Sequence, residues 1–163
     1  MTRLDVFIRR MQAQRACIDM VAGQLRGLEG PILEVGLGNG RTYDHLRDRF
    51  PDREIFVFDR EVAAHPDCIP PDRLLRLGDF RASVPAYLAE KQAASVFIHA
   101  DIGSANKAKS LRLAADLAPT FLGILAPGGY LVCDQLIVLN GLEPLALPES
   151  PDDGQYHLYR RVA

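Results

Sequence analysis

The fold of this chain is decided by one stretch, residues 32–40, which reads ILEVGLGNG. An apolar run with a single acid leads into glycines at every second position, which is typical of a buried strand that enters a tight loop against a ligand. A dinucleotide loop of the form G-x-G-x-x-G is excluded, because the sixth position counted from Gly36 is Arg41. A phosphate loop of the form G-x-x-x-x-G-K-S/T is excluded, because no lysine follows Gly40.

Apolar strands and helical patterns alternate along the rest of the chain. They predict strands at 31–36, 54–59, 74–77, 95–101 and 130–134. Helices are predicted at 41–49, 82–92 and 105–125, the last kinked or divided at Pro119, and a short irregular crossover at 62–71. This alternation indicates a mostly parallel, doubly wound α/β sheet with helices on both faces. After Asp134 the pattern predicts a final strand at 155–162, with 142–147 as its antiparallel neighbour.

Residues 2–26 predict one long N-terminal helix, which Gly30-Pro31 ends. Its apolar residues recur at spacings of three and four and form one stripe, in which Gln14 fills a gap: Leu4, Phe7, Met11, Ile18, Val21, Leu25 and Leu28. We favour burial of this stripe against the chain's own sheet, and the alternative is the seam of a homodimer. We expect a single domain over residues 1–163, with the helix in 1–28, a core at 31–134 and C-terminal strands at 135–163.

Composition is that of an ordinary globular protein, with 163 residues, 48% hydrophobic and 25% charged. The net charge of −2 implies no general affinity for nucleic acid. No apolar run approaches the roughly 20 residues of a membrane span, and no signal peptide is expected. The three cysteines, Cys17, Cys68 and Cys133, are far apart and indicate reduced thiols in a cytoplasmic protein.

The pattern E-x-G-x-G-x-G at residues 34–40 resembles motif I of the class I S-adenosylmethionine (SAM)-dependent methyltransferases. The resemblance covers residues 31–134, because Asp59, Asp79 and Asp101 stand at the next three strand ends in the order of the family's pattern. In open α/β sheets, ligands bind outside these strand ends. The resemblance implies a Rossmann-like class I methyltransferase fold, methyltransferase activity and SAM as the cofactor.

The resemblance also implies a role for each of these positions. The glycine loop would lie against the amino-acid half of SAM, and Glu34 would support the loop or reach the ligand ammonium through water. Asp59 would accept from both ribose hydroxyls, because two carboxylate oxygens match two neighbouring donors. Asp79 would accept from the adenine amine, beside Phe80. The implied cofactor-binding residues are Glu34, Gly36, Leu37, Gly38, Asn39, Gly40, Thr42, Asp59, Arg60, Gly78, Asp79, Phe80, Ala100 and Asp101.

Some of these residues have a local alternative. Capping of the following helix explains Asn39 and Thr42 equally well, and Arg41 is either a partner of the SAM carboxylate or a solvated residue. A lone aspartate after a strand often caps a helix. Three such acids together with the glycine loop favour a SAM site.

The reacting end is expected where Ala100 and Asp101 end the fourth strand. Attack on the methyl group of a sulfonium removes its positive charge, so much of the catalysis can be positioning in a site that excludes water. Asp101 and His99 are the candidate catalytic residues, since side chains two apart on a strand point the same way. For His99 we favour the alternative of a buried, hydrogen-bonded core histidine over a general base.

The ends of the fourth and fifth strands are also similar to those of the catechol and caffeoyl-CoA O-methyltransferases. In those enzymes an Asp and an Asp-Asn pair hold a divalent cation that lowers the pKa of the acceptor hydroxyl. The equivalents here would be Asp101, Asp134 and Gln135, whose oxygens suit Mg²⁺ or Ca²⁺, although glutamine replaces asparagine. We favour a site without metal and keep a metal-assisted O-methyltransferase as an alternative.

The methyl acceptor is expected to be a small molecule with an oxygen or nitrogen nucleophile. Neither nucleic acid nor a membrane is expected as a partner. No inserted domain or basic patch is visible, and the Asn/Asp-Pro-Pro-Tyr motif of many amino-group methyltransferases does not follow the fourth strand. The first helix and residues 136–151 would form the acceptor's walls. The alternatives are a SAM-binding module without catalysis and a nicotinamide-dependent enzyme.

Overall fold

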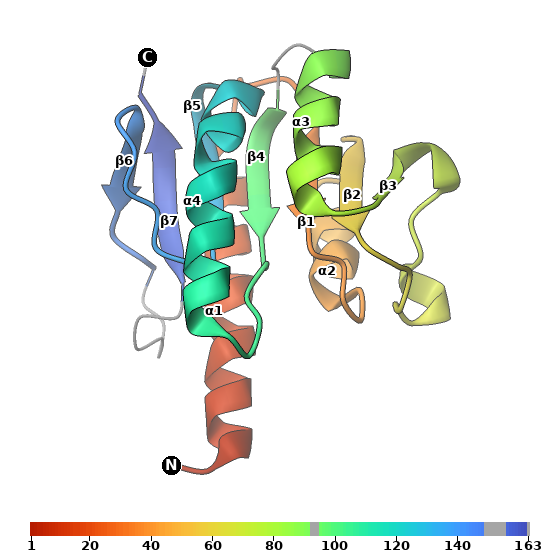
Figure 1. Cartoon of the computed structure of the whole chain (residues 1–163), viewed down its shortest axis with the longest axis vertical. Helices are drawn as coiled ribbons and strands as arrows, with labels where there is room; N and C mark the ends of the chain where they lie inside the picture. Colours follow the sequence, from red (N-terminus) through yellow and green to blue (C-terminus); the bar gives the residue numbers. More distant parts are fainter. Residues whose placement is uncertain (92–94, 149–155, 163) are drawn as a thin grey trace.

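A mixed seven-stranded sheet forms the centre of the computed structural model, which describes residues 1–91, 95–148 and 156–162 (Figure 1). Its strand order is β3-β2-β1-β4-β5-β7-β6. Five strands run parallel: β1 (Ile32–Val35), β2 (Ile55–Asp59), β3 (Leu75–Leu77), β4 (Ser95–Ala100) and β5 (Leu125–Cys133). The last two are antiparallel: β7 (His157–Arg161) pairs with β5, and β6 (Leu142–Leu145) pairs with β7. The predicted fold class is confirmed.

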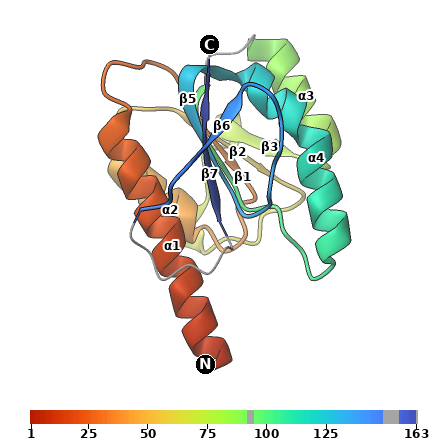
Figure 2. The same ribbon diagram turned by 90° about the vertical axis from the view of Figure 1, so that its left-hand side faces the viewer.

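Helices cover both faces of this sheet, as the alternating pattern predicted. Figure 2 shows α1 (Arg3–Gln24) and α2 (Arg41–Arg49) on one side, and α3 (Phe80–Lys91) and α4 (Lys107–Ile124) on the other. Strand side chains alternate between two apolar clusters, so that Ile32 packs beneath α1 and α2 while Leu33 packs beneath α3 and α4. The crossover after β2 consists of two short 3-10 turns, Pro66–Cys68 and Asp72–Leu74, as its prolines predicted.

The segment between α4 and β5 differs from the prediction. α4 runs as one helix through Pro119 and does not divide into two segments there, and the alternative of a kink stays a prediction. β5 begins at Leu125 rather than Tyr130, because residues 126–129 form an irregularity within the strand. Opposite it, the paired register jumps from Ser95 and Leu125 to Phe97 and Tyr130. The last residue of the predicted helix 82–92 and the first residue of the predicted strand 155–162 lie outside the described residues. So does the part of the expected acceptor wall at 149–151.

The N-terminal helix corrects the expectation that its stripe is buried along its whole length. Its second half packs on the sheet through Ala13, Gln14, Cys17, Ile18 and Val21. The first half projects beyond the sheet, as Figure 2 shows, and leaves Leu4 65% and Phe7 46% exposed. Thr2 and Asp5 form a capping box that begins the helix, so local hydrogen bonds stabilise this free end.

The three cysteines are free thiols, as predicted. None of the helices among the described residues is long and apolar enough to cross a membrane. The cytoplasmic location stays a prediction.

Candidate functional site

The glycine loop leaves β1 at the centre of the sheet, between β2 and β4. Gly36, Gly38 and Gly40 all have positive φ angles, of 100°, 50° and 89°. A Cβ atom at Gly36 would overlap the backbone carbonyl oxygen of Asp101, so both conformation and space require glycine there. A Cβ atom at Gly38 would meet nothing within 4 Å. The loop thus packs against β4 at one end and faces open space at its middle.

Asp59 at the end of β2 ties this loop to the sheet. Its Oδ2 accepts hydrogen bonds from the backbone amides of Leu37 at 2.9 Å and Gly38 at 3.1 Å. Its Oδ1 accepts from the amide of Arg60 at 2.7 Å. Sequence reasoning expected a ribose acceptor and missed this structural role. A carboxylate has about four lone-pair directions, and the three amides use three of them, so Oδ1 keeps room for one ribose hydroxyl rather than for the expected pair.

Glu34 supports the loop from beneath and is fully buried. It accepts a hydrogen bond from the Thr42 hydroxyl of α2 and lies 2.7 Å from Nδ1 of His99. Burial lowers the pKa of His99, but the charge and hydrogen bond of Glu34, together with the charges of Asp101 and Asp134, outweigh this effect, so the net pKa is raised. His99 is fully buried, which matches the alternative favoured for it. No side chain caps α2, whose N-cap is Gly40, so the capping alternative for Asn39 and Thr42 is wrong.

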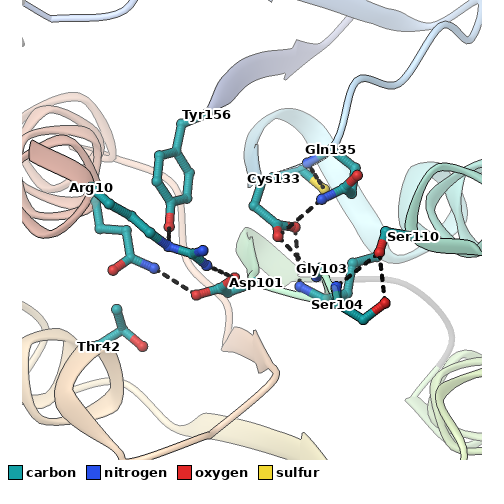
Figure 3. Close-up of polar contacts among 12 residues, drawn as sticks. Arg10, Thr42, Asp101, Gly103, Ser104, Ser110, Cys133, Gln135 and Tyr156 are labelled. Atoms are coloured by element: carbon teal, nitrogen blue, oxygen red, sulfur yellow. Dashed lines mark hydrogen bonds and ion pairs between the residues drawn. The ribbon is translucent and has the colours of Figure 1, made fainter. Parts of the chain in front are cut away.

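Asp101 at the end of β4 is held by α1. Its Oδ1 accepts from Nη2 of Arg10 at 2.5 Å, and its Oδ2 accepts from Nε2 of Gln14 at 2.8 Å. Nε of Arg10 also donates to the hydroxyl of Tyr156 at 3.1 Å, and Figure 3 shows Arg10 between Tyr156 and Asp101. Sequence reasoning missed Arg10 and Tyr156. Gln14 left a signal, because it is a polar residue inside an apolar stripe.

Asp79 follows β3 and is held by local contacts. Its carboxylate is 3.5 Å from Arg60 in an exposed ion pair and accepts from the amide of Arg81 at the start of α3. Phe80, the next residue, borders the cavity described below. The structure therefore places Asp79 at a helix start, and its contact with adenine stays a prediction.

A cavity of about 360 Å³ lies at this edge of the sheet, within the range of small-ligand sites. It brings together eight of the predicted residues: Gly36, Leu37, Gly38, Asn39, Thr42, Asp59, Phe80 and Asp101. The other residues that line it are Arg10, Met11, Gln14, Arg41, Ile102 and Gly103. The remaining predicted residues do not line this cavity: Glu34, Gly40, Arg60, Gly78, Asp79 and Ala100.

A second cavity of about 750 Å³ adjoins the first and shares Arg10 and Gly103 with it. Asp134, at the end of β5, lines it and accepts from the backbone amides of Ile102 at 3.1 Å and Gly103 at 2.8 Å. Burial and the nearby charge of Asp101 raise the pKa of Asp134 to about 6. A Cβ atom at position 103 would overlap the Asp134 carboxylate, so a side chain there would displace that carboxylate from the junction of the cavities.

The three candidate metal ligands lie together at the ends of β4 and β5 but do not fit a divalent cation in this arrangement. Both oxygens of Asp101 are bound by α1, and both oxygens of Asp134 accept backbone amides. The amide nitrogen of Gln135 donates to Asp134 at 3.1 Å, as part of the contacts in Figure 3. In the described part of the chain, no three His, Cys, Asp or Glu side chains form a metal-binding group. The Arg10 guanidinium supplies the positive charge beside Asp101.

The mostly parallel sheet, the glycine loop and the cavity at the strand ends define a Rossmann-like domain of the SAM-methyltransferase class. The chain belongs to a family of S-adenosyl-L-methionine methyltransferases, whose model matches residues 1–161. It is similar to an S-adenosyl-L-methionine methyltransferase from Silicibacter pomeroyi DSS-3, with 46% identity, a TM-score of 0.93 and 99% of each chain covered. The chain is therefore a SAM-dependent methyltransferase with SAM as its cofactor, which confirms the predicted enzyme class over its two alternatives.

More distant structures share only the fold. The MycE methyltransferase of mycinamycin biosynthesis, in complex with Mg and SAH, is 13% identical with a TM-score of 0.60, over 88% of this chain and 44% of that one. The 16S rRNA (adenine(1408)-N(1))-methyltransferase W203A mutant from Catenulisporales acidiphilia is 14% identical with a TM-score of 0.51, over 90% of each chain. No curated protein matched the chain.

Proposed function

We propose that this enzyme transfers the methyl group of SAM to an oxygen or nitrogen atom of a small molecule that binds in the second cavity. The observation that carries the proposal is the junction between the two cavities. Both are lined by Arg10 and Gly103, and Asp101 and Asp134 stand on its two sides at the ends of neighbouring strands. A donor in the first cavity and an acceptor in the second would meet at this junction.

The first cavity has the groups that SAM needs. The amides and open face of the glycine loop suit its amino-acid half, the remaining lone pair on Oδ1 of Asp59 suits a ribose hydroxyl, and Phe80 offers a ring face or edge to adenine. Asp101, bound by Arg10 and Gln14, acts by holding α1 across the reacting end. Catalysis by positioning and exclusion of water is therefore proposed, in place of a general base at Asp101 or His99.

The second cavity supports a small acceptor. Its volume falls in the range of small-molecule sites, and its lining combines the polar Asp134 and Gln135 with the apolar Leu111 and Leu136. The Asp134 carboxylate can accept a hydrogen bond from a hydroxyl or amine of the acceptor. The net charge of −2 also argues against a nucleic-acid acceptor, although one protein that shares the fold is an rRNA methyltransferase.

The direct test is a metabolite screen that measures release of S-adenosylhomocysteine (SAH). Once an acceptor is found, Leu111→Trp should fill the second cavity and lower turnover at least tenfold, while SAM affinity stays within twofold. Leu77→Trp is the matched control, because Leu77 is similarly exposed, at 53% against 47%, and does not line the second cavity. Full turnover by Leu111→Trp would move the acceptor elsewhere, and turnover only with RNA would refute the small-molecule proposal.

A further inference from the structure

The buried histidine of β4 has a hydrogen-bond partner for only one of its two ring nitrogens. His99 is fully buried, and its Nδ1 lies 2.7 Å from Oε2 of Glu34. Among the residues that the structure describes, nothing forms a hydrogen bond with its Nε2. A buried polar atom without a partner is unfavourable, so an apolar residue would serve packing better at this position. The contact with Glu34 is therefore the feature of His99 that needs a functional explanation.

Glu34 connects this histidine to the cofactor cavity. Its Oε1 accepts the hydroxyl proton of Thr42, which lines the cavity at the start of α2. Burial disfavours a charged imidazole, but the charge and hydrogen bond of Glu34, with the two aspartates at the ends of β4 and β5, outweigh this effect and raise the pKa of His99. The histidine thus donates to Glu34, and the carboxylate can only accept from Thr42. The Thr42 hydroxyl is left with its lone pairs for the cavity.

We propose that His99 is a positioning residue for the cofactor: through Glu34 it fixes Thr42 as a hydrogen-bond acceptor for the α-ammonium group of SAM. A hydroxyl that turned its proton to the cavity would not match this group, because both would then present donors. The proposal rests on SAM occupying the first cavity, as proposed above, but not on the identity of the methyl acceptor.

A second side chain in the cavity has its polarity fixed in the same way. Nε2 of Gln14 donates to Asp101 at 2.8 Å, and because a carboxylate only accepts, the amide cannot be reversed. Its Oε1 has no partner among the described residues, and Gln14 lines the cavity together with Thr42. The positive charge of Arg10 is offset by Asp101, which its guanidinium contacts at 2.5 Å, and Figure 3 shows Thr42 below this pair. The cavity thus offers neutral acceptors from both α1 and α2 to the N–H groups of an ammonium.

Calorimetry on the full chain tests the role of the hydroxyl with two ligands: SAH, and the SAH analogue that has hydrogen in place of the α-amino group. We expect the wild type to bind SAH at least tenfold more tightly than the analogue. Thr42→Val keeps the shape of the side chain but removes the acceptor, so it should weaken SAH binding at least fivefold and leave the analogue within twofold. Thr42→Ser is the matched control, because it keeps the hydroxyl and should retain the preference for SAH.

The same two ligands test the residues behind the hydroxyl. Glu34→Gln can still accept from His99 through its oxygen, but its amide nitrogen then faces Thr42 and turns the hydroxyl proton to the cavity, so the preference for SAH should fall at least fivefold. His99→Leu should lower it at least threefold, because Glu34 then takes up a proton and can donate to Thr42. His99→Asn places an amide nitrogen near the position of Nδ1 and should restore most of the preference. Circular dichroism confirms that each variant is folded, and Glu34→Gln still tests the proposal if His99→Leu does not fold.

Four results would overturn the proposal. Equal affinity of the wild type for the two ligands would mean that the ammonium is not recognised. Equal weakening of both ligands by Thr42→Val or Glu34→Gln would mean that these residues only support the loop. An unchanged preference in His99→Leu, or a loss in His99→Asn as large as in His99→Leu, would remove His99 from this role. If the wild type binds neither ligand, the proposed SAM site itself fails, which is a different result from binding without preference.

Discussion

The two halves of α1 have the same apolar periodicity and opposite surroundings. Ile18 and Val21 in the second half are fully buried beneath the sheet, whereas Leu4 and Phe7 in the first half are mostly or half exposed. Arg10 and Gln14 lie between them and hold Asp101 at the cofactor cavity. The comparison teaches that periodicity identifies which face of a helix is apolar, while the length of the sheet beneath it decides how much of that face the chain can bury itself.

The largest expected effect is a difference in unfolding free energy between substitutions in the two halves of α1. Ile18→Ala should lower the free energy of unfolding by about 2–5 kcal/mol, because it leaves a cavity in a closed core. Ile8→Ala should change it by less than about 0.5 kcal/mol, because Ile8 is 44% exposed. Urea denaturation measures both. Equal losses would mean that the projecting half is buried within one chain.

The next effect compares the sheet side of the cofactor cavity with the helix side. Asp59→Ala should weaken SAH binding by about 1.5–3 kcal/mol, because it removes a charged acceptor and unties the loop from β2. Met11→Ala, on α1, should cost about 1 kcal/mol from lost apolar contact. Calorimetry measures both, and an unchanged affinity of Asp59→Ala would refute its assignment to ribose.

A smaller effect tests the hydrogen bond by which Gln14, between the two halves of α1, holds Asp101. Gln14→Leu should destabilise the protein by about 1 kcal/mol, because it removes the donor to Oδ2 of Asp101 while keeping the size of the side chain. The matched control is Gln12→Leu on the exposed side of the same helix, which should have no measurable effect. Thermal unfolding measures the difference, and identical behaviour of the two variants would show that Gln14 does not anchor α1.

The smallest expected effect is that of metal removal. Because Asp101 pairs with Arg10 and Gln14 of α1, EDTA or added Mg²⁺ should leave SAH release unchanged within error. Loss of activity with EDTA and its recovery with Mg²⁺ would mean that α1 gives up Asp101 to a cation, and the metal-assisted alternative would return.

Much of the sheet edge that borders the cofactor cavity could be predicted, because its sequence signals are local. The glycine loop needs positive φ angles, and apolar strands end in acids at regular intervals, so each feature is visible within a few neighbouring residues. The partners of Asp101 could not be predicted, because Arg10 and Gln14 lie 91 and 87 residues away. The pairing of Glu34 with His99 likewise depends on β1 lying beside β4 in that register. The start of β5 at Leu125 was missed, because Pro127-Gly128-Gly129 has the same local signal in a turn as in an irregular strand.

The sequence by itself determined the fold class, the loop that faces the cofactor and the enzyme family, because strand alternation and glycine geometry are properties of short segments. Only the tertiary structure decided that Asp101 binds α1 rather than a metal, that His99 is buried against Glu34, and that half of α1 projects beyond the sheet. Those outcomes depend on which distant segments share a surface, and burial and charge pairing act through space rather than along the chain.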